Sequence, residues 1–356
     1  MRFGKIRSSL IVAVGLAVLA TVSGCGGNAS APTGQESTSQ VTLEEKMIPS
    51  SEAGAQLYLR HKYLTSQKTV DDNHVVLFLE PFSVPTAMAF DVPGMSWMEP
   101  YAEEGYDTWA LDFRGFGKST RPAEMNEPAT QNKPVIHVQD SVEDLATAVD
   151  YIKKTRGVDK IDIVGWSYGS VVAADYAGLN PNNVNRLVLT GFMNGFNEPF
   201  MADPYAVKGN PMELNPDLPA YQAVPWSMAM MHWDIEMGKN QWTLPDAMEK
   251  VGEVYTASDP AAQTSADHSV RRPMGPLVDL YYIWTNRPLY SLSKITAPTL
   301  VIRGSADFMS EPNVLKKLTG TKVKQEVVIQ DATHWVLYEK NRDQLIDKTK
   351  TFLDGH

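Results

Sequence analysis

The sequence contains only one cysteine in 356 residues. A single cysteine cannot form a disulfide within the chain, so a disulfide-stabilised scaffold is excluded. Basic residues are also few, because 32 lysines and arginines stand against 42 acidic residues and give a formal net charge of −10. An acidic chain is a poor partner for nucleic acid or an anionic lipid surface. The sequence also lacks an internal repeat, a metal-ligand cluster, a Walker motif and a Gly-x-Gly-x-x-Gly run opening a helix, so it predicts neither a metal nor an organic cofactor.

Residues 1–24 have the order of an export signal. Three basic residues precede an apolar segment over 10–20, which is too short to span a bilayer comfortably, and small residues follow. Cys25 stands directly after Ser23-Gly24 and resembles the lipidated cysteine of the bacterial lipobox. The resemblance implies a fatty acyl anchor, such as palmitate, on Cys25. An ordinary signal peptide followed by an unused thiol, or a retained membrane anchor, is the alternative.

Residues 25–45 are expected to form a flexible tether, because most of this stretch is small, polar and without periodicity. Loss of the three basic residues of 1–24 would change the formal net charge from −10 to −13. We therefore expect an exported bacterial lipoprotein, held at the cell membrane or the outer membrane by its lipid and not by direct lipid binding.

A serine between two glycines is the most informative motif in the chain. Ser167 lies within 165–169, after an apolar run over 160–164 that is typical of a buried strand and before a segment over 170–177 that is typical of a helix. Hydrolytic enzymes use such a strand-turn-helix to expose a nucleophilic hydroxyl in strained backbone geometry. A plain turn between a strand and a helix is the alternative.

A serine hydroxyl is a weak nucleophile at neutral pH and needs a histidine base and an orienting carboxylate. Asp307 is the predicted acid, because it follows a buried strand expected over 299–304. Glu198 and Asp203, after the preceding strand, are weaker candidates. His334 is the predicted base, in the loop after the next strand, over 325–329. We expect no chemical role for the other histidines, which are His61, His74, His137, His232, His268 and His356.

The order serine, aspartate, histidine along the chain is that of the α/β-hydrolase superfamily. The chain resembles this superfamily from about residue 50 to its end, with 112–119 matching the Asp-x-Arg-Gly-x-Gly-x-Ser segment that follows the fourth strand. The resemblance implies an α/β fold with a mostly parallel central sheet and helices on both faces. Its core is expected over 46–191 and 292–356, and 112–119 is interpreted as a structural turn.

The loop after the strand 75–79 departs from the family pattern. Most relatives carry His-Gly there, whereas this chain has Glu80-Pro81, followed by Phe82. The resemblance implies an oxyanion hole made by the backbone N–H groups of Phe82 and Tyr168. The loop from 81 to 99 is longer than the fold needs and is expected to line or cover the pocket.

Residues 192–291 are expected to form a helical cap domain over the sheet. This insertion is rich in methionine and aromatic residues, most of which should simply pack the cap onto the core. Together they favour a small or medium apolar substrate with an acyl or aromatic group.

The resulting hypothesis is a serine hydrolase that cleaves a carboxylic ester through an acyl-enzyme. The same triad also cleaves carbon–carbon bonds, thioesters, lactones and amides in related enzymes, and these alternatives stay open. Epoxide hydrolases and haloalkane dehalogenases are disfavoured, because those relatives carry aspartate where Ser167 stands. A non-catalytic binding module on the same fold is the remaining alternative. The sequence leaves the oligomeric state open.

Overall fold

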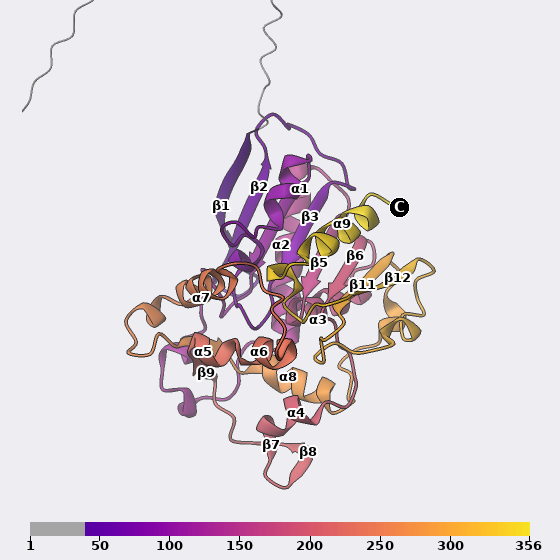
Figure 1. The fold of residues 1–356 in the computed structure, drawn as a ribbon. Helices are drawn as coiled ribbons and strands as arrows, with labels where there is room; N and C mark the ends of the chain where they lie inside the picture. The colour runs from indigo at the N-terminus through magenta and orange to yellow at the C-terminus, as the bar shows by residue number, and fades with distance from the viewer. Residues whose placement is uncertain (1–39) are drawn as a thin grey trace, which may run out of the picture. The chain divides into compact units, whose positions relative to one another are not determined.

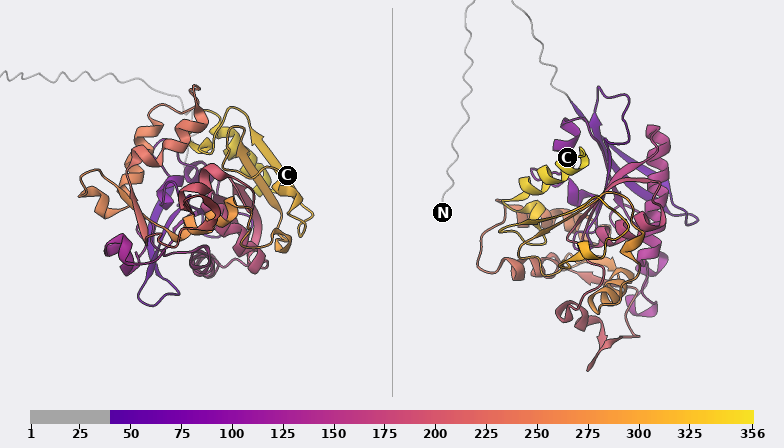
Figure 2. Two further views of the ribbon diagram at one scale, coloured as in Figure 1. Left: turned by 90° about the horizontal axis from the view of Figure 1, so that it is seen from below. Right: turned by 90° about the vertical axis from the view of Figure 1, so that its right-hand side faces the viewer.

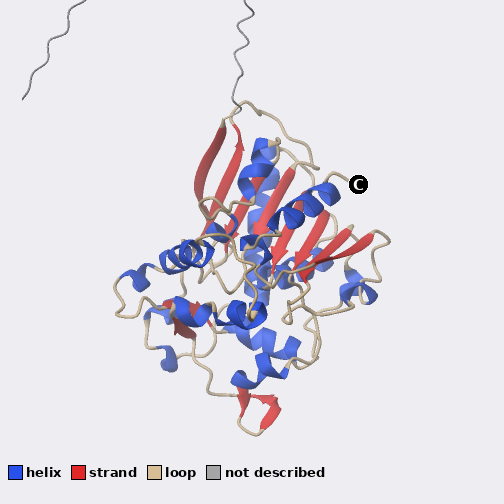
Figure 3. Ribbon diagram, viewed as in Figure 1, coloured by secondary structure: helices blue, strands red, loops and turns tan. Residues whose placement is uncertain are grey.

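The structure is a computed structural model that describes residues 40–356. Its centre is an eight-stranded sheet with the strand order β1-β2-β4-β3-β5-β6-β11-β12 (Figures 1 and 3). The strands are β1 Val41–Pro49, β2 Gln56–Leu64, β3 Val75–Leu79, β4 Asp107–Asp112, β5 Ile161–Trp166, β6 Val184–Thr190, β11 Thr299–Gly304 and β12 Lys324–Ile329. The pairs β1–β2 and β2–β4 are antiparallel, and every pair from β4 to β12 is parallel. This confirms the expected α/β-hydrolase fold with a mostly parallel sheet.

Helices cover both faces of the sheet, as the two views of Figure 2 show. On one face lie α2 (Val138–Arg156) and α3 (Tyr168–Leu179), and on the other lie α1 (Met98–Glu103) and α9 (Arg342–Leu353). Single turns of 3₁₀ helix connect these elements at Ala87–Phe90, Ala123–Asn126, Ala129–Gln131, Asp203–Tyr205, Pro260–Gln263, Leu292–Lys294, Val314–Lys316 and Val336–Tyr338. Parallel strands need long crossover connections, and helices that return over the sheet supply them.

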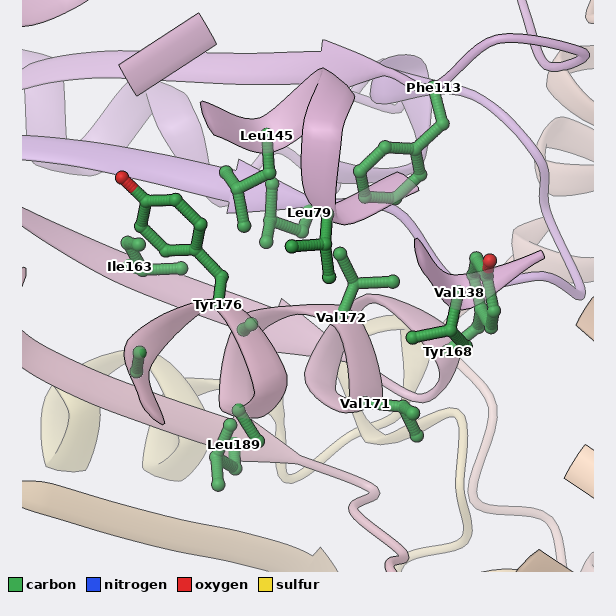
Figure 4. Close-up of a cluster of buried hydrophobic side chains, with 14 of the residues drawn as sticks. Leu79, Phe113, Val138, Leu145, Ile163, Tyr168, Val171, Val172, Tyr176 and Leu189 are labelled. Carbon is green, nitrogen blue, oxygen red and sulfur yellow. The ribbon is translucent and has the colours of Figure 1, made fainter. Parts of the chain in front are cut away.

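Strand β3 shows how the sequence builds the two-sided core. All five of its residues are apolar and fully buried, because both faces of a central parallel strand are covered. Successive side chains point to opposite faces, so Leu77 and Leu79 pack with the α2–α3 layer, while Phe78 packs with the α1–α9 layer. Figure 4 shows the first of these clusters, in which Leu79 meets Val172 of α3 and Leu145 of α2.

The chain between β6 and β11 departs from a purely helical insertion. Its helices are α4 Pro199–Ala202, α5 Trp226–Ala229, α6 Met231–Met237, α7 Ala247–Ala257 and α8 Gly275–Trp284. Its strands are β7 Ala206–Val207, β8 Asn210–Leu214, β9 Tyr221–Val224 and β10 Val270–Pro273, paired as two small antiparallel sheets. Frequent prolines, such as Pro211, Pro225 and Pro273, limit helix length, and short extended pieces pair instead. In Figure 1 this segment lies at the end of the sheet toward which the parallel strands point.

The amino-terminal boundary also differs from the expectation. Residues 41–45, which the sequence analysis included in the tether, form the first half of β1 and pair with β2. The pairing satisfies backbone groups that a tether would leave to water. The predicted signal segment and Cys25 lie outside the described residues. Within 40–356, no helix combines the length and the apolar character needed to cross a membrane.

Candidate active site

Ser167 lies in a strained turn at the junction of β5 and α3. Its backbone has φ 55° and ψ −117°, a conformation that non-glycine residues rarely adopt. A Cβ on Gly165 would come within 2.6 Å of the Ser170 Cα, and a Cβ on Gly169 would collide with the Leu79 carbonyl oxygen. The two glycines therefore let strand, helix and the end of β3 approach closely around the serine.

Asp307 and His334 are in direct contact. Asp307 follows β11 and His334 follows β12, and the Nδ1 of His334 donates to the Oδ2 of Asp307 at 2.9 Å. The backbone N–H groups of Met309 and Ser310, each 3.0 Å away, and the Ser310 hydroxyl also donate to the carboxylate. Burial alone would raise the pKa of Asp307, but the charge of His334 and these hydrogen bonds hold the pKa below its usual value.

Close contacts hold both the backbone and the imidazole of His334. The indole N–H of Trp166, next to the serine, donates to the His334 carbonyl oxygen at 3.0 Å. Gly191, at φ 62°, lies so close that a Cβ there would be 2.6 Å from the imidazole Cε1. Among residues 40–356, the buried Nε2 of His334 has no hydrogen-bond partner, Ser167 included. The structure thus pairs the predicted acid and base and brings Ser167 and His334 to one cavity, without a hydrogen bond between these two side chains.

The loop that carries His334 is held by Glu236, a residue that the sequence did not indicate as part of the site. Glu236 of α6 accepts the backbone N–H of His334 at 2.8 Å and that of Phe308 at 3.2 Å. Burial, followed by the charge of Asp307, raises the pKa of Glu236 to about 9. The alternative acids Glu198 and Asp203 make no hydrogen bond to His334 within the described chain, and Asp203 is exposed.

The two predicted oxyanion donors are the residue directly after Ser167 and a residue of the loop after β3. Tyr168 is the first residue of α3, where a helix leaves its N–H groups without intrahelical partners. Phe82 follows the Glu80-Pro81 turn, and its ring centroid lies 6.5 Å from that of Tyr168. Within 40–356, neither backbone N–H donates a hydrogen bond. Both amides are therefore free to bind an anionic oxygen, provided that it reaches them from the cavity.

A cavity with mostly apolar walls lies at this site. Its walls are Phe82, Ser83, Ser167, Met193, Met201, Tyr205, Met228, Ala229, His232, Arg272, Leu277, Leu280, Trp284, Met309, His334 and Trp335. Of the loop from 81 to 99, Phe82 and Ser83 line the cavity, so the expected contact with the pocket is confirmed for the start of the loop alone. Its large apolar residues, Phe90 and Trp97, pack into the α1–α9 core instead.

Two basic residues in the cavity wall, His232 and Arg272, were not predicted as part of a site. His232 was expected to be an ordinary histidine, yet it lines the cavity, where burial, then Arg272 and His334, lower its pKa to about 4. Arg272, from β10, stands opposite the predicted oxyanion loop, with its guanidinium 4.7 Å from the Phe82 ring centroid. Neither residue belongs to a local motif, so sequence spacing gave no signal for them.

Comparison with known proteins identifies the family. The family model described as alpha/beta hydrolase fold matches residues 92–341, which is most of the chain. The chain belongs to this family of hydrolases. The Caenorhabditis elegans protein named abhydrolase domain-containing protein abhd-5.2 is 34% identical over 89 residues. That alignment covers 25% of this chain and only 18% of the nematode protein.

Solved structures similar to this α/β-hydrolase cover nearly all of its described part. The alpha/beta hydrolase fold protein from Chitinophaga pinensis has a TM-score of 0.55 and 14% identity, covering 88% of this chain and 98% of the other. A thermophilic esterase from Thermogutta terrifontis has a TM-score of 0.55 and 17% identity, covering 87% and 98%. Potato (Solanum tuberosum) epoxide hydrolase I has a TM-score of 0.56 and 15% identity, covering 88% and 100%. At these identities the likeness establishes the fold alone.

Proposed function

We propose that this α/β-hydrolase is a serine hydrolase that cleaves the carboxylic ester of a small or medium apolar substrate. One observation carries the proposal. Ser167, in a strained turn at the start of a helix, opens onto the same cavity as His334, whose other ring nitrogen is bound to Asp307. Nucleophile, base and orienting acid are the three groups that acyl transfer by a serine requires.

In the proposed mechanism, the Nε2 of His334 accepts the proton of Ser167 as the hydroxyl oxygen attacks the ester carbonyl carbon. Such hydrogen bonds are often long before substrate binds and shorten in the complex. Asp307 keeps the proton on Nδ1, so that Nε2 presents its lone pair, and it stabilises the imidazolium that forms. The carbonyl oxygen becomes an oxyanion, which the N–H groups of Tyr168 and Phe82 bind.

The tetrahedral intermediate then collapses to the acyl-enzyme. The bond to the alcohol oxygen breaks, and the alcohol leaves with the proton held on His334. A water molecule next attacks the acyl carbon while giving a proton to His334, and the acid departs as Ser167 regains its hydrogen. Every proton taken by His334 is returned, so these steps consume only ester and water.

The substrate class follows from the cavity and from the segment above it. We assign 192–291 as the cap, because Met193, Met201, Met228 and Trp284 of this segment form much of the cavity wall. Mostly apolar walls beside Ser167 suit a small or medium apolar acyl or aryl ester.

Replacement of the nucleophile tests the mechanism. Ser167→Ala should abolish both hydrolysis of short p-nitrophenyl esters and covalent labelling by a fluorophosphonate probe, because the variant lacks the proposed nucleophile. Ser170→Ala is a matched control, since that buried hydroxyl donates to the Thr190 carbonyl oxygen and does not line the cavity. The control should retain labelling. Esterase turnover that persists in Ser167→Ala would refute the proposal.

A substrate panel separates the alternatives. Esters, thioesters, lactones, amides and ring-fission products can all be offered to the purified protein, because the same triad could act on each. If the protein prefers a substrate other than an ester, the proposed bond type is wrong, whereas the proposed nucleophile, Ser167, still stands. If the protein turns over none of these substrates and Ser167 is not labelled by the fluorophosphonate probe, a non-catalytic binding module is favoured.

For the amino terminus, we propose that residues 1–24 are an export signal and that Cys25 carries a lipid anchor. The support is the basic and apolar order of this segment and the position of the only cysteine of the chain after Ser23-Gly24. The enzyme would then act at a bacterial membrane surface, tethered by its lipid.

A further inference from the structure

Arg272 is a buried arginine without a counter-ion in the described chain. It is 9% exposed, and within 40–356 its side chain makes no hydrogen bond and no ion pair. Its neighbour Arg271 provides the contrast, because it binds Asp259 through two nitrogens at 2.8 and 2.9 Å and the Met125 carbonyl oxygen at 2.7 Å. Of these two neighbours on β10, Arg271 therefore has hydrogen-bond partners for its guanidinium, whereas Arg272 lines the cavity.

A buried guanidinium without a partner is costly, because burial removes water that would otherwise solvate the charge. Contact with the Phe82 ring, at 4.7 Å from Cζ to the centroid, compensates part of this cost. The groups nearby supply no opposite charge. His232 is neutral at neutral pH, since burial, Arg272 and His334 lower its pKa, and the Asp307 carboxylate is bound by His334 and Ser310.

The donor set of Arg272 therefore suits an anion that arrives with the substrate. A planar guanidinium binds a carboxylate through two parallel hydrogen bonds, and one uncompensated positive charge matches one monoanionic group. Apart from His232, which is neutral at neutral pH, and the pair Ser167 and His334, the wall is mostly apolar, so a second charge on the substrate would have no counter-ion there. Because Arg272 and Ser167 line the same cavity, one small molecule can meet both.

We propose that Arg272 selects substrates that carry a carboxylate in addition to the scissile ester. This inference rests on the proposed serine esterase function and defines its substrate class more narrowly. The substrate would be an apolar ester with one carboxylate, bound with the carboxylate at Arg272 and the ester carbonyl at Ser167. Its hydrolysis would release an alcohol and an acid, one of which retains the carboxylate.

Two isosteric esters test the selection. The p-nitrophenyl monoester of glutaric acid carries a free carboxylate, and the corresponding ester of glutaric acid monoamide replaces it by a neutral amide. A hydrogen bond to a charged group corresponds to a kcat/KM ratio of roughly 10- to 100-fold in favour of the carboxylate in the wild-type protein. Arg272→Met should bring the ratio to about one, and Arg272→Lys should keep part of it, since the lysine retains the charge but not the planar fork.

The ratio within each variant cancels any general loss of activity. If neither variant folds, the wild-type protein still provides a test, because hexanoate should inhibit turnover of a neutral ester at least about tenfold better than hexanamide. This inhibition does not depend on which side of the ester carries the carboxylate. Fluorophosphonate labelling shows separately whether Ser167 is reactive, whatever the role of Arg272.

The outcomes separate the two proposals. Wild-type protein that is unlabelled and turns over neither ester would refute the serine hydrolase itself. Labelled wild-type protein that treats the two esters alike and binds hexanoate no better than hexanamide would overturn the role of Arg272 alone. An unchanged carboxylate preference in a folded Arg272→Met variant would overturn it as well.

Discussion

Glu236→Gln should change how the stability of this α/β-hydrolase depends on pH. Glu236 is 8% exposed and lies behind the histidine loop, where it accepts the N–H groups of His334 and Phe308. Burial and the nearby charge of Asp307 raise its pKa from 4.5 to about 9. At neutral pH the folded protein therefore holds a proton on this carboxyl, which the unfolded chain has released.

The sign of the effect follows from proton binding. Between pH 4.5 and about 9 the folded state binds more protons at Glu236 than the unfolded state, so the free energy of unfolding falls as pH rises. The stabilisation is fully present below pH 4.5 and is lost by the time pH has risen through about 9. One group with this shift contributes a slope of about 1.4 kcal/mol per pH unit, or roughly 2.7 kcal/mol between pH 6 and 8. Glutamine does not titrate, so the variant lacks this slope.

The free energy of unfolding can be measured with urea for wild-type and Glu236→Gln protein at several pH values between about 6 and 8. The difference between the two proteins isolates Glu236, because the contributions of all other groups cancel to first order. We expect the wild-type protein to lose stability relative to the variant as pH rises. Asp234→Asn is a matched control on the same helix, since Asp234 is exposed, and it should leave the slope unchanged. Parallel curves for wild-type and Glu236→Gln protein would refute the assignment of a raised pKa.

Two further substitutions test the serine turn and the anchor. Gly169→Ala should abolish fluorophosphonate labelling, because the new Cβ would collide with the Leu79 carbonyl oxygen and displace the turn from the loop after β3; full labelling of a folded variant would contradict this packing. Cys25→Ser should release the protein from membranes or block its maturation, as measured by cell fractionation and by the mass of the mature amino terminus. Unchanged fractionation would contradict a lipid anchor.

The fold could be predicted because its signals are local. The apolar run over 75–79, the turn around Ser167 and the strand over 299–304 each carry their own pattern of hydrophobicity and glycine, and all three elements are present in the structure. Asp307 and His334 could be paired before the structure was known, because each follows a parallel strand, and the carboxyl ends of such strands meet at one edge.

Glu236 and Arg272 could not be found in this way. They lie on α6 and β10, in the segment between β6 and β11. They reach the site only because this segment packs against the carboxyl ends of the parallel strands. Nothing in the neighbouring sequence distinguishes Glu236 from Asp234, or Arg272 from Arg271. What separates them is burial and the identity of distant partners, which periodicity does not encode.

A long-range contact also explains why this chain can carry Glu80-Pro81 where most relatives carry His-Gly. Glu80 is fully buried, and its Oε1 accepts the N–H of Phe113 at 2.8 Å. Burial and then the charge of Asp112 raise the pKa of Glu80 well above its usual value. Through its hydrogen bond to Phe113, this buried carboxyl links the loop after β3 to the turn after β4. Pro81 also restricts the backbone next to Phe82, whose N–H has no hydrogen-bond partner within residues 40–356, as the proposed role of an oxyanion donor requires.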